Sequence, residues 1–167
     1  MEIIDKTFKR KPKVFMLQSL MAVVTVAVIL CFVEILTHAA IVAALGASTF
    51  IVFAMPHSVT AQPRKLIGGH IVGILSGIVC YYAFLTGPLG ELITSWEFTT
   101  LFIYALAVGL SIFLMAVTNT EHPPAAATAL GVVAHAWSYQ IVVFVLLCAI
   151  GLALVRGLLD SRLRDLV

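Results

Sequence analysis

The sequence predicts an all-α integral membrane protein, a small polytopic helical bundle of five to six hydrophobic segments that includes one short segment begun by proline. Two observations on composition indicate this class. Hydrophobic residues make up 62% of the chain and charged residues only 11%, whereas a soluble domain has about 25% charged residues. The third observation is the length of the apolar runs, most of which approach the roughly 20 residues that a helix needs to cross a bilayer.

Six apolar segments follow one another along the chain. They cover about 14–33, 39–55, 66–86, 99–118, 123–136 and 138–157. The second is slightly short for a crossing and the fifth is clearly short. An alternative is to take the fifth and sixth together as one crossing helix and a re-entrant piece, which leaves five crossings. In domain terms, we expect a basic cytoplasmic segment (1–13), a transmembrane domain (14–157) and a cytoplasmic tail (158–167).

The positions of the basic residues favour six crossings with a cytoplasmic N-terminus. With that topology all ten Lys and Arg residues lie on the cytoplasmic side, whereas five crossings place three arginines outside. Loops that stay in the cytoplasm are enriched in Lys and Arg. The sequence therefore predicts a multi-pass protein of the inner (plasma) membrane. Arg64 and Lys65 have the alternative role of anchoring this topology and nothing more.

Two stretches of the chain resemble each other, residues 46–70 and 109–135. Both open with the pattern G-x-S-x-F, both contain a His next to a Pro, and both end on a second His thirteen positions after the first. The paired histidines are His57 with His70 and His122 with His135. Transporters are often built from weak internal repeats, so we expect a parallel repeat, with chance similarity as the alternative.

The stretch TNTEHPP, residues 118–124, interrupts the apolar pattern of the second copy. Proline has no amide hydrogen and a fixed φ, so it stops one helix and suits the first turn of the next. The hydroxyl and amide side chains of residues 118–120 can cap the free backbone groups, and the alanines at 125–127 allow close helix packing. We therefore expect a helix break here and a matching one at residues 56–64.

Irregular backbone at membrane depth is tolerated only where it is buried in protein or lines a wet cavity. A helix that starts in such a cavity presents unpaired N–H groups, which suit an anion. Two converging helix starts, at Pro63 and Pro123, therefore predict an anion site. The alternative is a tight hairpin that only turns the chain.

Both stretches resemble the HPP family of integral membrane proteins. The His-Pro-Pro that gives the family its name is carried by His122, Pro123 and Pro124, and the first copy has the similar Ala-Gln-Pro-Arg region at residues 61–64. The resemblance covers about residues 14–157. Members often have Gly where this chain has Ala126, and the family is usually described with four membrane helices, fewer than the six segments counted here.

The resemblance implies transport, because cyanobacterial and chloroplast relatives are associated with nitrite movement across membranes. We expect a channel or transporter for a small inorganic anion, most favourably nitrite, that lies in the lipid bilayer and forms a homo-oligomer, with a dimer favoured. No nucleic acid partner, cofactor or metal is expected. The expected substrate-binding residues are Ser58, Thr60, Gln62, Arg64, His70, Thr118, Asn119, Thr120, His122, Pro123 and Pro124.

Two other classes of function remain open. A non-transporting membrane anchor or regulatory subunit is the main alternative, although short loops and tails offer little docking surface. An enzyme is not expected, because the chain lacks a nucleophile elbow, an HExxH motif and paired carboxylates, and no catalytic residue is assigned. His122 has two readings: it donates a hydrogen bond to an oxyanion, or it caps a backbone carbonyl. Gly69, Gly73 and Gly77 predict a close-packing helix face.

Overall fold

The computed structural model describes residues 10–31, 39–86, 90–91, 97–135 and 138–166. Regular structure in this part of the chain is entirely helical, which confirms the predicted fold class. The elements are α2 (Pro12–Cys31), α3 (Ala39–Ala54), the 3-10 turn η1 (Val59–Ala61), α4 (Pro63–Phe84), α6 (Glu97–Thr118), α7 (Pro124–Ala134) and α8 (Tyr139–Leu159).

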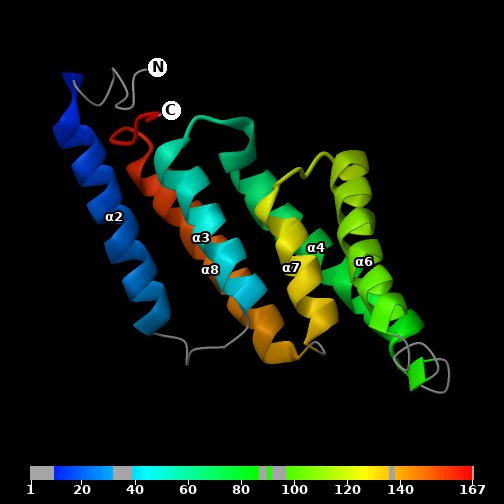
Figure 1. The fold of residues 1–167 in the computed structure, drawn as a ribbon. Helices are drawn as coiled ribbons and strands as arrows, with labels where there is room; N and C mark the ends of the chain where they lie inside the picture. The colour runs from blue at the N-terminus through cyan, green and yellow to red at the C-terminus, as the bar shows by residue number, and fades with distance from the viewer. Residues whose placement is uncertain (1–9, 32–38, 87–89, 92–96, 136–137, 167) are drawn as a thin grey trace, which may run out of the picture.

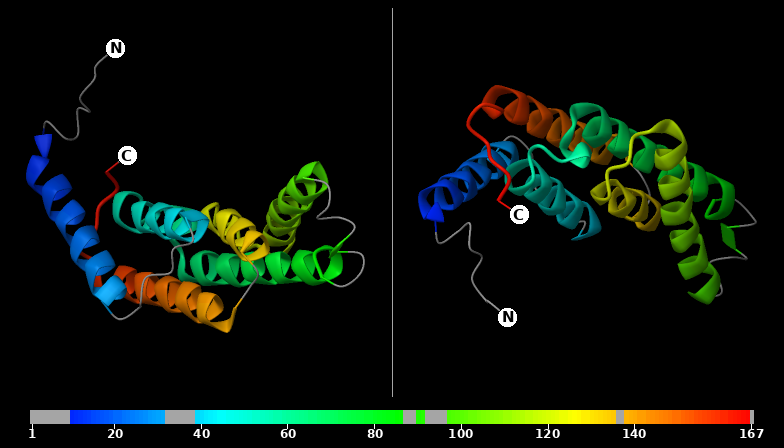
Figure 2. Two further views of the ribbon diagram at one scale, coloured as in Figure 1. Left: turned by 60° about the horizontal axis from the view of Figure 1, so that its bottom comes forward. Right: turned by 90° about the horizontal axis from the view of Figure 1, so that it is seen from above.

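The helices run alternately up and down between two ends of the bundle (Figure 1). The start of α2, the C-terminal segment and both helix breaks lie at one end. Helices α4 and α8 form one layer. The other four helices, α2, α3, α7 and α6, lie on one side of this layer (Figure 2). Helix α4 packs against α6, α7 and α8, and α7 packs against α3, α4 and α6, so α4 and α7 form the centre of the fold.

Each predicted apolar segment corresponds to one helix, with ends displaced by at most three residues. Among the residues whose side chains the structure describes, three helices are long and apolar enough to cross a membrane by themselves, namely α4, α6 from Phe98 and α8. Helix α7 has 11 residues, which span only about 16 Å against the roughly 30 Å of a hydrocarbon core. Helix α7 alone is therefore too short for a crossing, in keeping with the short fifth segment of the sequence, and the number of crossings stays a prediction.

The fifth crossing is discontinuous. Residues 119–123 leave the end of α6 as non-helical backbone and lead back into the bundle, where α7 begins (Figure 1). Asn119 has a left-handed φ of 55° and Pro123 is helical, with φ −51° and ψ −39°, so this segment is only partly extended and adds less than a fully extended chain would to the length of α7. Non-helical backbone inside a membrane has to be covered by protein. In this segment Thr120 and His122 are buried, whereas Asn119 and Pro123 are exposed.

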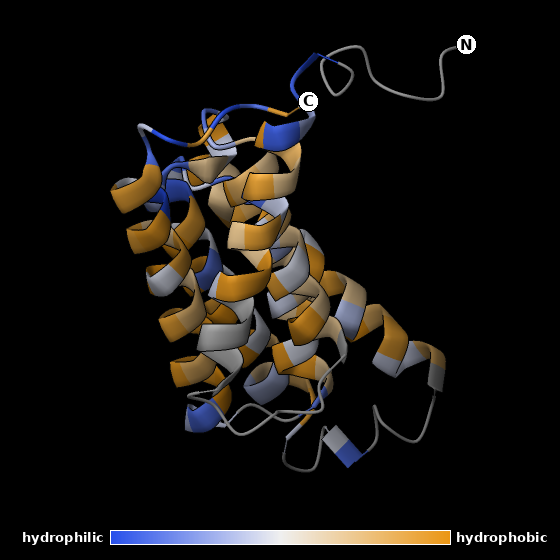
Figure 3. Cartoon of the chain, turned by 90° about the vertical axis from the view of Figure 1, so that its left-hand side faces the viewer, coloured by the Kyte–Doolittle hydropathy of each residue, from blue (hydrophilic) through white to orange (hydrophobic). Residues whose placement is uncertain are grey.

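The outer surface and the ends of the bundle differ in polarity. Large apolar side chains are exposed along the sides of α2 and α6, as at Leu20 (59% exposed) and Phe102 (66%), which suits contact with lipid rather than water. Hydrophilic residues gather at the end where α2 starts (Figure 3). Every lysine and arginine that the structure describes belongs to this end, at the starts of α2 and α4 or at and after the end of α8.

The two similar stretches both form a helix, a break and a second helix that starts with proline, as the repeat predicts. The breaks lie at the same end of the bundle, and α3 packs on α7 as α6 packs on α4. The cross-packing pairs the first helix of each copy with the second helix of the other. This arrangement brings residues of both breaks together.

Candidate functional site

A row of polar side chains crosses the centre of the bundle. His122 is 0% exposed and its Nε2 lies 2.9 Å from Ser48 Oγ on α3. The same hydroxyl lies 3.1 Å from His70 Nε2 on α4, and His70 Nδ1 lies 2.9 Å from Thr128 Oγ1 on α7. The two imidazole rings have centroids 5.2 Å apart. Four side chains from four segments of the chain thus form one continuous row of hydrogen bonds.

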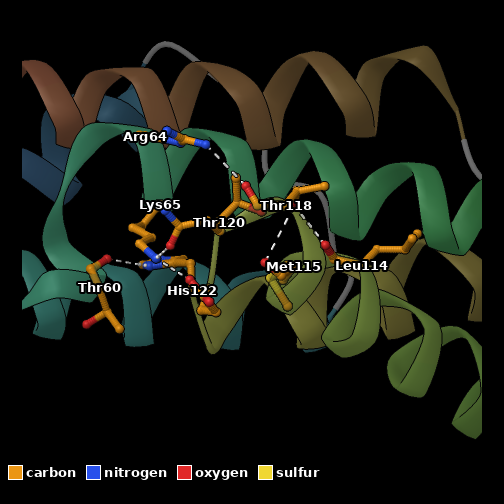
Figure 4. Close-up of polar contacts among 10 residues, drawn as sticks. Thr60, Arg64, Lys65, Leu114, Met115, Thr118, Thr120 and His122 are labelled. Atoms are coloured by element: carbon orange, nitrogen blue, oxygen red, sulfur yellow. Dashed lines mark hydrogen bonds and ion pairs between the residues drawn. The ribbon is translucent and has the colours of Figure 1, made fainter.

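The backbone of the first break forms a hydrogen bond with the second ring nitrogen of His122. Its Nδ1 donates to the carbonyl oxygen of Thr60 in η1 at 2.9 Å (Figure 4). Sequence reasoning left two readings of His122, a donor to an anion or a cap on a backbone carbonyl, and the carbonyl contact is the one present. His122 therefore joins the two breaks directly, which only close packing of the segment 119–123 against α4 permits.

Glycines on α4 allow that close packing. A Cβ built on Gly69 would lie 2.7 Å from His122 Cβ, and one on Gly73 would lie 2.4 Å from the carbonyl oxygen of Ala125. One on Gly77 would lie 2.8 Å from the carbonyl oxygen of Ala129. The predicted glycine face therefore mates with α7 of the same chain.

A buried lysine connects α4 to the second break. Lys65 is 6% exposed, and its Nζ donates to Asn119 Oδ1 at 2.6 Å and forms an ion pair with Glu121 (Figure 4). The hydrogen bond that Lys65 donates to Glu121, together with the positive charge of Lys65, lowers the pKa of the exposed Glu121 carboxyl. Asn119 has a φ of 55°, a left-handed conformation that asparagine tolerates better than most residues. The turn at Asn119 directs both acceptors back to Lys65.

The remaining polar residues of the breaks bind backbone or one another. Thr118 Oγ1 donates to the carbonyl of Leu114 at 2.7 Å and so caps the end of α6. Arg64 is exposed and its Nη2 donates to the carbonyl of Thr118 at 3.3 Å. These contacts hold the C-terminal end of α6 against the start of α4.

The predicted binding residues divide into two groups. His70 and His122 are buried at the centre, where His122 bonds to the backbone carbonyl of Thr60, whereas Asn119 is exposed and bonds to Lys65. The hydroxyls of Ser58 and Thr60 bond each other at 3.1 Å, as do those of Thr118 and Thr120 at 2.8 Å. The side chains of Gln62, Arg64 and Pro123 are exposed.

One expectation about the helix starts is corrected. Unpaired N–H groups were expected at the start of α7, but the N–H of Ala125 bonds to the carbonyl of His122 at 2.9 Å and that of Ala126 to the carbonyl of Pro123 at 3.1 Å. Helix α7 begins at Pro124, with Pro123 as its cap residue and no side-chain cap. The helical conformation of Pro123 turns the chain tightly enough for the backbone to satisfy itself.

Four residues at the site were not expected from the sequence, namely Ser48, Lys65, Glu121 and Thr128. The sequence does mark Ser48, because it is the serine of the repeated G-x-S-x-F pattern. Its counterpart Ser111 is also buried but donates to Val108 of its own helix at 2.8 Å. Lys65 looked like a topology anchor, and only the turn at Asn119 brings its two partners, Asn119 and Glu121, within reach.

The space beside the row is small. A cavity next to Ser48, His70 and Thr128 has about 10 Å³ available to the centre of a water molecule, and apolar residues of α3 and α8 line the rest of it. This volume admits about one water molecule. A triatomic anion cannot enter without a movement of side chains, so the described conformation is closed.

The other two histidines of the repeat lie away from this row. His57 forms an ion pair with Asp165 of the C-terminal segment at 3.4 Å, and both side chains are about half exposed. His135 lies at the other end of the bundle, with Nδ1 3.2 Å from the carbonyl of Gly131. Within the described ranges, no three or more His, Cys, Asp or Glu side chains are grouped so as to hold a metal ion.

Comparison with known proteins gives a family match. The family model described as "HPP, transmembrane region" matches residues 8–165. Two proteins of Dictyostelium discoideum, each described only as a transmembrane protein, are similar to the chain. One is 41% identical over 90 residues, which is 54% of this chain and 28% of the relative. The other is 38% identical over 86 residues, 51% of this chain and 24% of the relative. The chain therefore matches about a quarter of each relative, and no solved structure matches it.

Proposed function

This chain belongs to the HPP transmembrane family, and we propose that it carries a small inorganic anion across the membrane, with nitrite as the leading substrate. The observation that carries the proposal is the discontinuous crossing formed by residues 119–123 and α7. Transporters place their substrate sites at helix interruptions of this kind, near the middle of the membrane. The resemblance to relatives associated with nitrite selects the substrate.

The buried lysine is the proposed anion-binding group. Lys65 is the one Lys or Arg among the described residues whose side chain is buried, and an unpaired charge in such a place is costly. Glu121 now supplies the negative partner. We propose that the substrate anion displaces the Glu121 carboxylate, which is exposed and can turn to water, while Asn119 donates through its amide.

Transport requires the closed conformation to open. The bonds that hold segment 119–123 to the rest of the bundle are those of His122 with Ser48 and Thr60, and of Lys65 with Asn119 and Glu121. The two hydrogen bonds of His122 contribute about 1 kcal/mol each and those of the charged Lys65 about 1.5–3 kcal/mol each, so opening of the segment costs several kcal/mol. We propose that segment 119–123 is the gate.

We further propose that the basic end of the bundle faces the cytoplasm in the inner (plasma) membrane. Lys and Arg are enriched in cytoplasmic loops, and every described Lys and Arg lies at this end. The gate would then open to the cytoplasm. A dimer and the absence of enzymatic activity remain predictions, the first of which native mass spectrometry of the purified protein can check.

A second candidate function is a membrane anchor or regulatory subunit. The observation in its favour is that the polar groups of both breaks are bonded to one another, as a purely structural core requires. The two candidates differ in one respect: an anchor needs the bonds to persist, whereas a transporter needs them to break.

Nitrite uptake by variants in liposomes tests the proposal. We expect Lys65→Met and His122→Ala to lower uptake by roughly tenfold or more, since charge and pairing in a buried site contribute about 1.5–3 kcal/mol. Arg64→Ala should lower uptake less, because this side chain is exposed. Ser111→Ala is the matched control. Wild-type rates in both Lys65→Met and His122→Ala would refute the assigned site.

A further inference from the structure

The hydrogen bonds of the central row have a direction that can be derived from their partners. A carbonyl oxygen only accepts, so His122 Nδ1, which lies 2.9 Å from the carbonyl of Thr60, carries a hydrogen. In neutral His122 the other nitrogen, Nε2, is then an acceptor and takes the hydrogen of Ser48. Because Ser48 has one hydrogen, its oxygen must accept from His70 Nε2. His70 Nδ1 is left as an acceptor for Thr128.

One arrangement of protons therefore satisfies the neutral row, running from Thr128 through His70 and Ser48 to His122. An added proton can stay on His70, which then donates from both ring nitrogens, or it can pass to His122 and give a second arrangement of the row. His122 then donates from Nε2 to Ser48, Ser48 donates to His70 Nε2, and His70 donates from Nδ1 to Thr128. All four contacts persist at the same distances, and the hydroxyl of Ser48 and the tautomer of His70 are reversed.

We propose that His70, Ser48 and His122 form a proton relay that couples proton movement to opening of the gate. A hydronium ion in the cavity gives its proton to His70 Nδ1, in place of the bond from Thr128. The proton on His70 Nε2 moves to Ser48, and the proton of Ser48 moves to His122 Nε2. One N–H or O–H bond breaks for each that forms, no electrons are transferred, and the positive charge ends on His122.

The charged and titratable groups around the relay are few. On α4, Lys65 is paired with Glu121 of the gate segment, and Arg64 is exposed and bonds to the end of α6. From α8, Cys148 lines the cavity beside His70. The described parts of α3 and α7 carry no charged side chain. A proton added to His122 therefore has Glu121 as its nearest carboxylate along the chain, and it places a second positive charge close to Lys65.

This second charge connects the relay to the proposed function, on which the coupling rests. A cationic His122 beside Lys65 favours binding of an anion that reaches the break from the opposite side of the membrane, and the proton leaves from Nδ1 when His122 parts from Thr60. An anion released through the open gate together with this proton crosses in the same direction. The relay itself, as a pair of linked protonation states, is a property of the three side chains and can be measured without transport.

Nitrogen-15 NMR of histidine-labelled protein in lipid bilayers tests the relay directly. We expect a hydrogen on Nδ1 of His122 and on Nε2 of His70 at neutral pH. On acidification, His122 should become doubly protonated while His70 changes to the Nδ1–H tautomer over the same pH range. The opposite neutral tautomers, independent titration of the two rings, or no proton uptake before the fold is lost would each overturn the relay.

Variants separate the relay from packing. Ser48→Ala should abolish the linked change of His70, and Ser111→Ala, its buried counterpart in the repeat, should leave the change intact. If Ser48→Ala does not insert, His70→Gln makes the same test through His122, whose titration should then shift. Linked behaviour that survives loss of the Ser48 hydroxyl would refute the assignment.

Uptake measurements distinguish failure of the relay from failure of the proposed function. Nitrite uptake into liposomes is measured with and without an inward proton gradient, after subtraction of empty liposomes. We expect the gradient to accelerate wild-type uptake by roughly tenfold or more, and Ser48→Ala to lose that acceleration. Absence of any wild-type uptake refutes the transport function, whatever the NMR result. If wild-type uptake occurs at the same rate with and without the proton gradient, only the coupling of proton and anion movement is refuted.

Discussion

Replacing Gly73 by alanine should push α4 and α7 apart and open the central row of hydrogen bonds. The new Cβ would lie 2.4 Å from the carbonyl oxygen of Ala125, where ordinary contact begins at 3.4 Å. The Cβ is fixed directly to the backbone of α4 and the oxygen belongs to the backbone of α7, so the helices have to separate by about 1.0 Å. One turn away, the bond between His70 and Thr128, now 2.9 Å, would lengthen beyond hydrogen-bonding distance.

The expected cost follows from these contacts. Overpacking a close interface costs about 1–3 kcal/mol, and loss of a buried hydrogen bond adds about 1 kcal/mol. At about 2–4 °C per kcal/mol for a chain of this size, the Tm should fall by roughly 4–16 °C. Thermal unfolding of purified protein in detergent measures this shift, and uptake of nitrite should fall with it.

Gly46→Ala is the matched control, because a Cβ at Gly46 on α3 meets nothing within 4 Å. Alanine is the better helix former by about 0.5–1 kcal/mol, so this variant should unfold at the same temperature as the wild type or slightly above it. If Gly73→Ala is as stable as Gly46→Ala, the close approach of α4 and α7 is not a real constraint and the packing argument fails.

Three further predictions concern the residues that hold the breaks and the tail. Because Lys65 lowers the pKa of Glu121, this pair should stabilise the fold above the ordinary carboxyl pKa of 4.5 and lose its effect as the pH falls through the lowered pKa; the Tm difference between wild type and Glu121→Gln should therefore shrink towards pH 3, and a constant difference would contradict the pairing. Asn119→Gly should be less destabilising than Asn119→Ala by about 1 kcal/mol, since glycine accepts a φ of 55° and alanine does not; chemical unfolding of the two variants decides, and equal stability would argue against the left-handed turn. Gln18, which is 1% exposed, donates to the carbonyls of Phe53 and Arg164 and accepts from the N–H of Arg164, so Gln18→Ala should release the C-terminal segment at a cost of about 2 kcal/mol; hydrogen exchange at residues 162–166 should accelerate, and unchanged protection would show that the tail is held elsewhere.

The helices could be predicted from the sequence because their causes are local. Each apolar run is bounded by charged, proline or polar residues, and helices are the only open structure that satisfies its backbone in lipid. The short α7 was visible as a short run. Its depth in the bundle was not, because it depends on how far residues 119–123 extend, which is decided by packing against the glycines of α4.

The site could be predicted only in part. His70 and His122 stood out, since ionisable residues inside a membrane domain are functional candidates by default. Ser48 and Thr128 did not, because a helical Ser or Thr commonly bonds to its own backbone, as Ser76 does to Val72 at 2.8 Å. Which hydroxyl faces a histidine on another helix depends on the rotation of both helices, and a single sequence does not contain that angle.

The contacts of the charged residue Lys65 could not be predicted from the sequence either. A lysine beside an arginine at a segment end predicts a solvated, cytoplasmic position, and Arg64 is exposed as expected. Lys65 instead points to the second break, where Glu121 lies only because Asn119 reverses the chain. The partner is 56 residues away in the sequence, so no local pattern identifies it.

Nitrite uptake by the purified wild-type protein in liposomes tests the central claim most directly, with Lys65→Met as the paired sample. We predict saturable uptake above that of empty liposomes, competition by a second small anion such as nitrate or formate, and strong loss in Lys65→Met. Folded, inserted protein that moves no anion above empty liposomes would contradict the account and leave the mutually bonded breaks as the core of an anchor subunit.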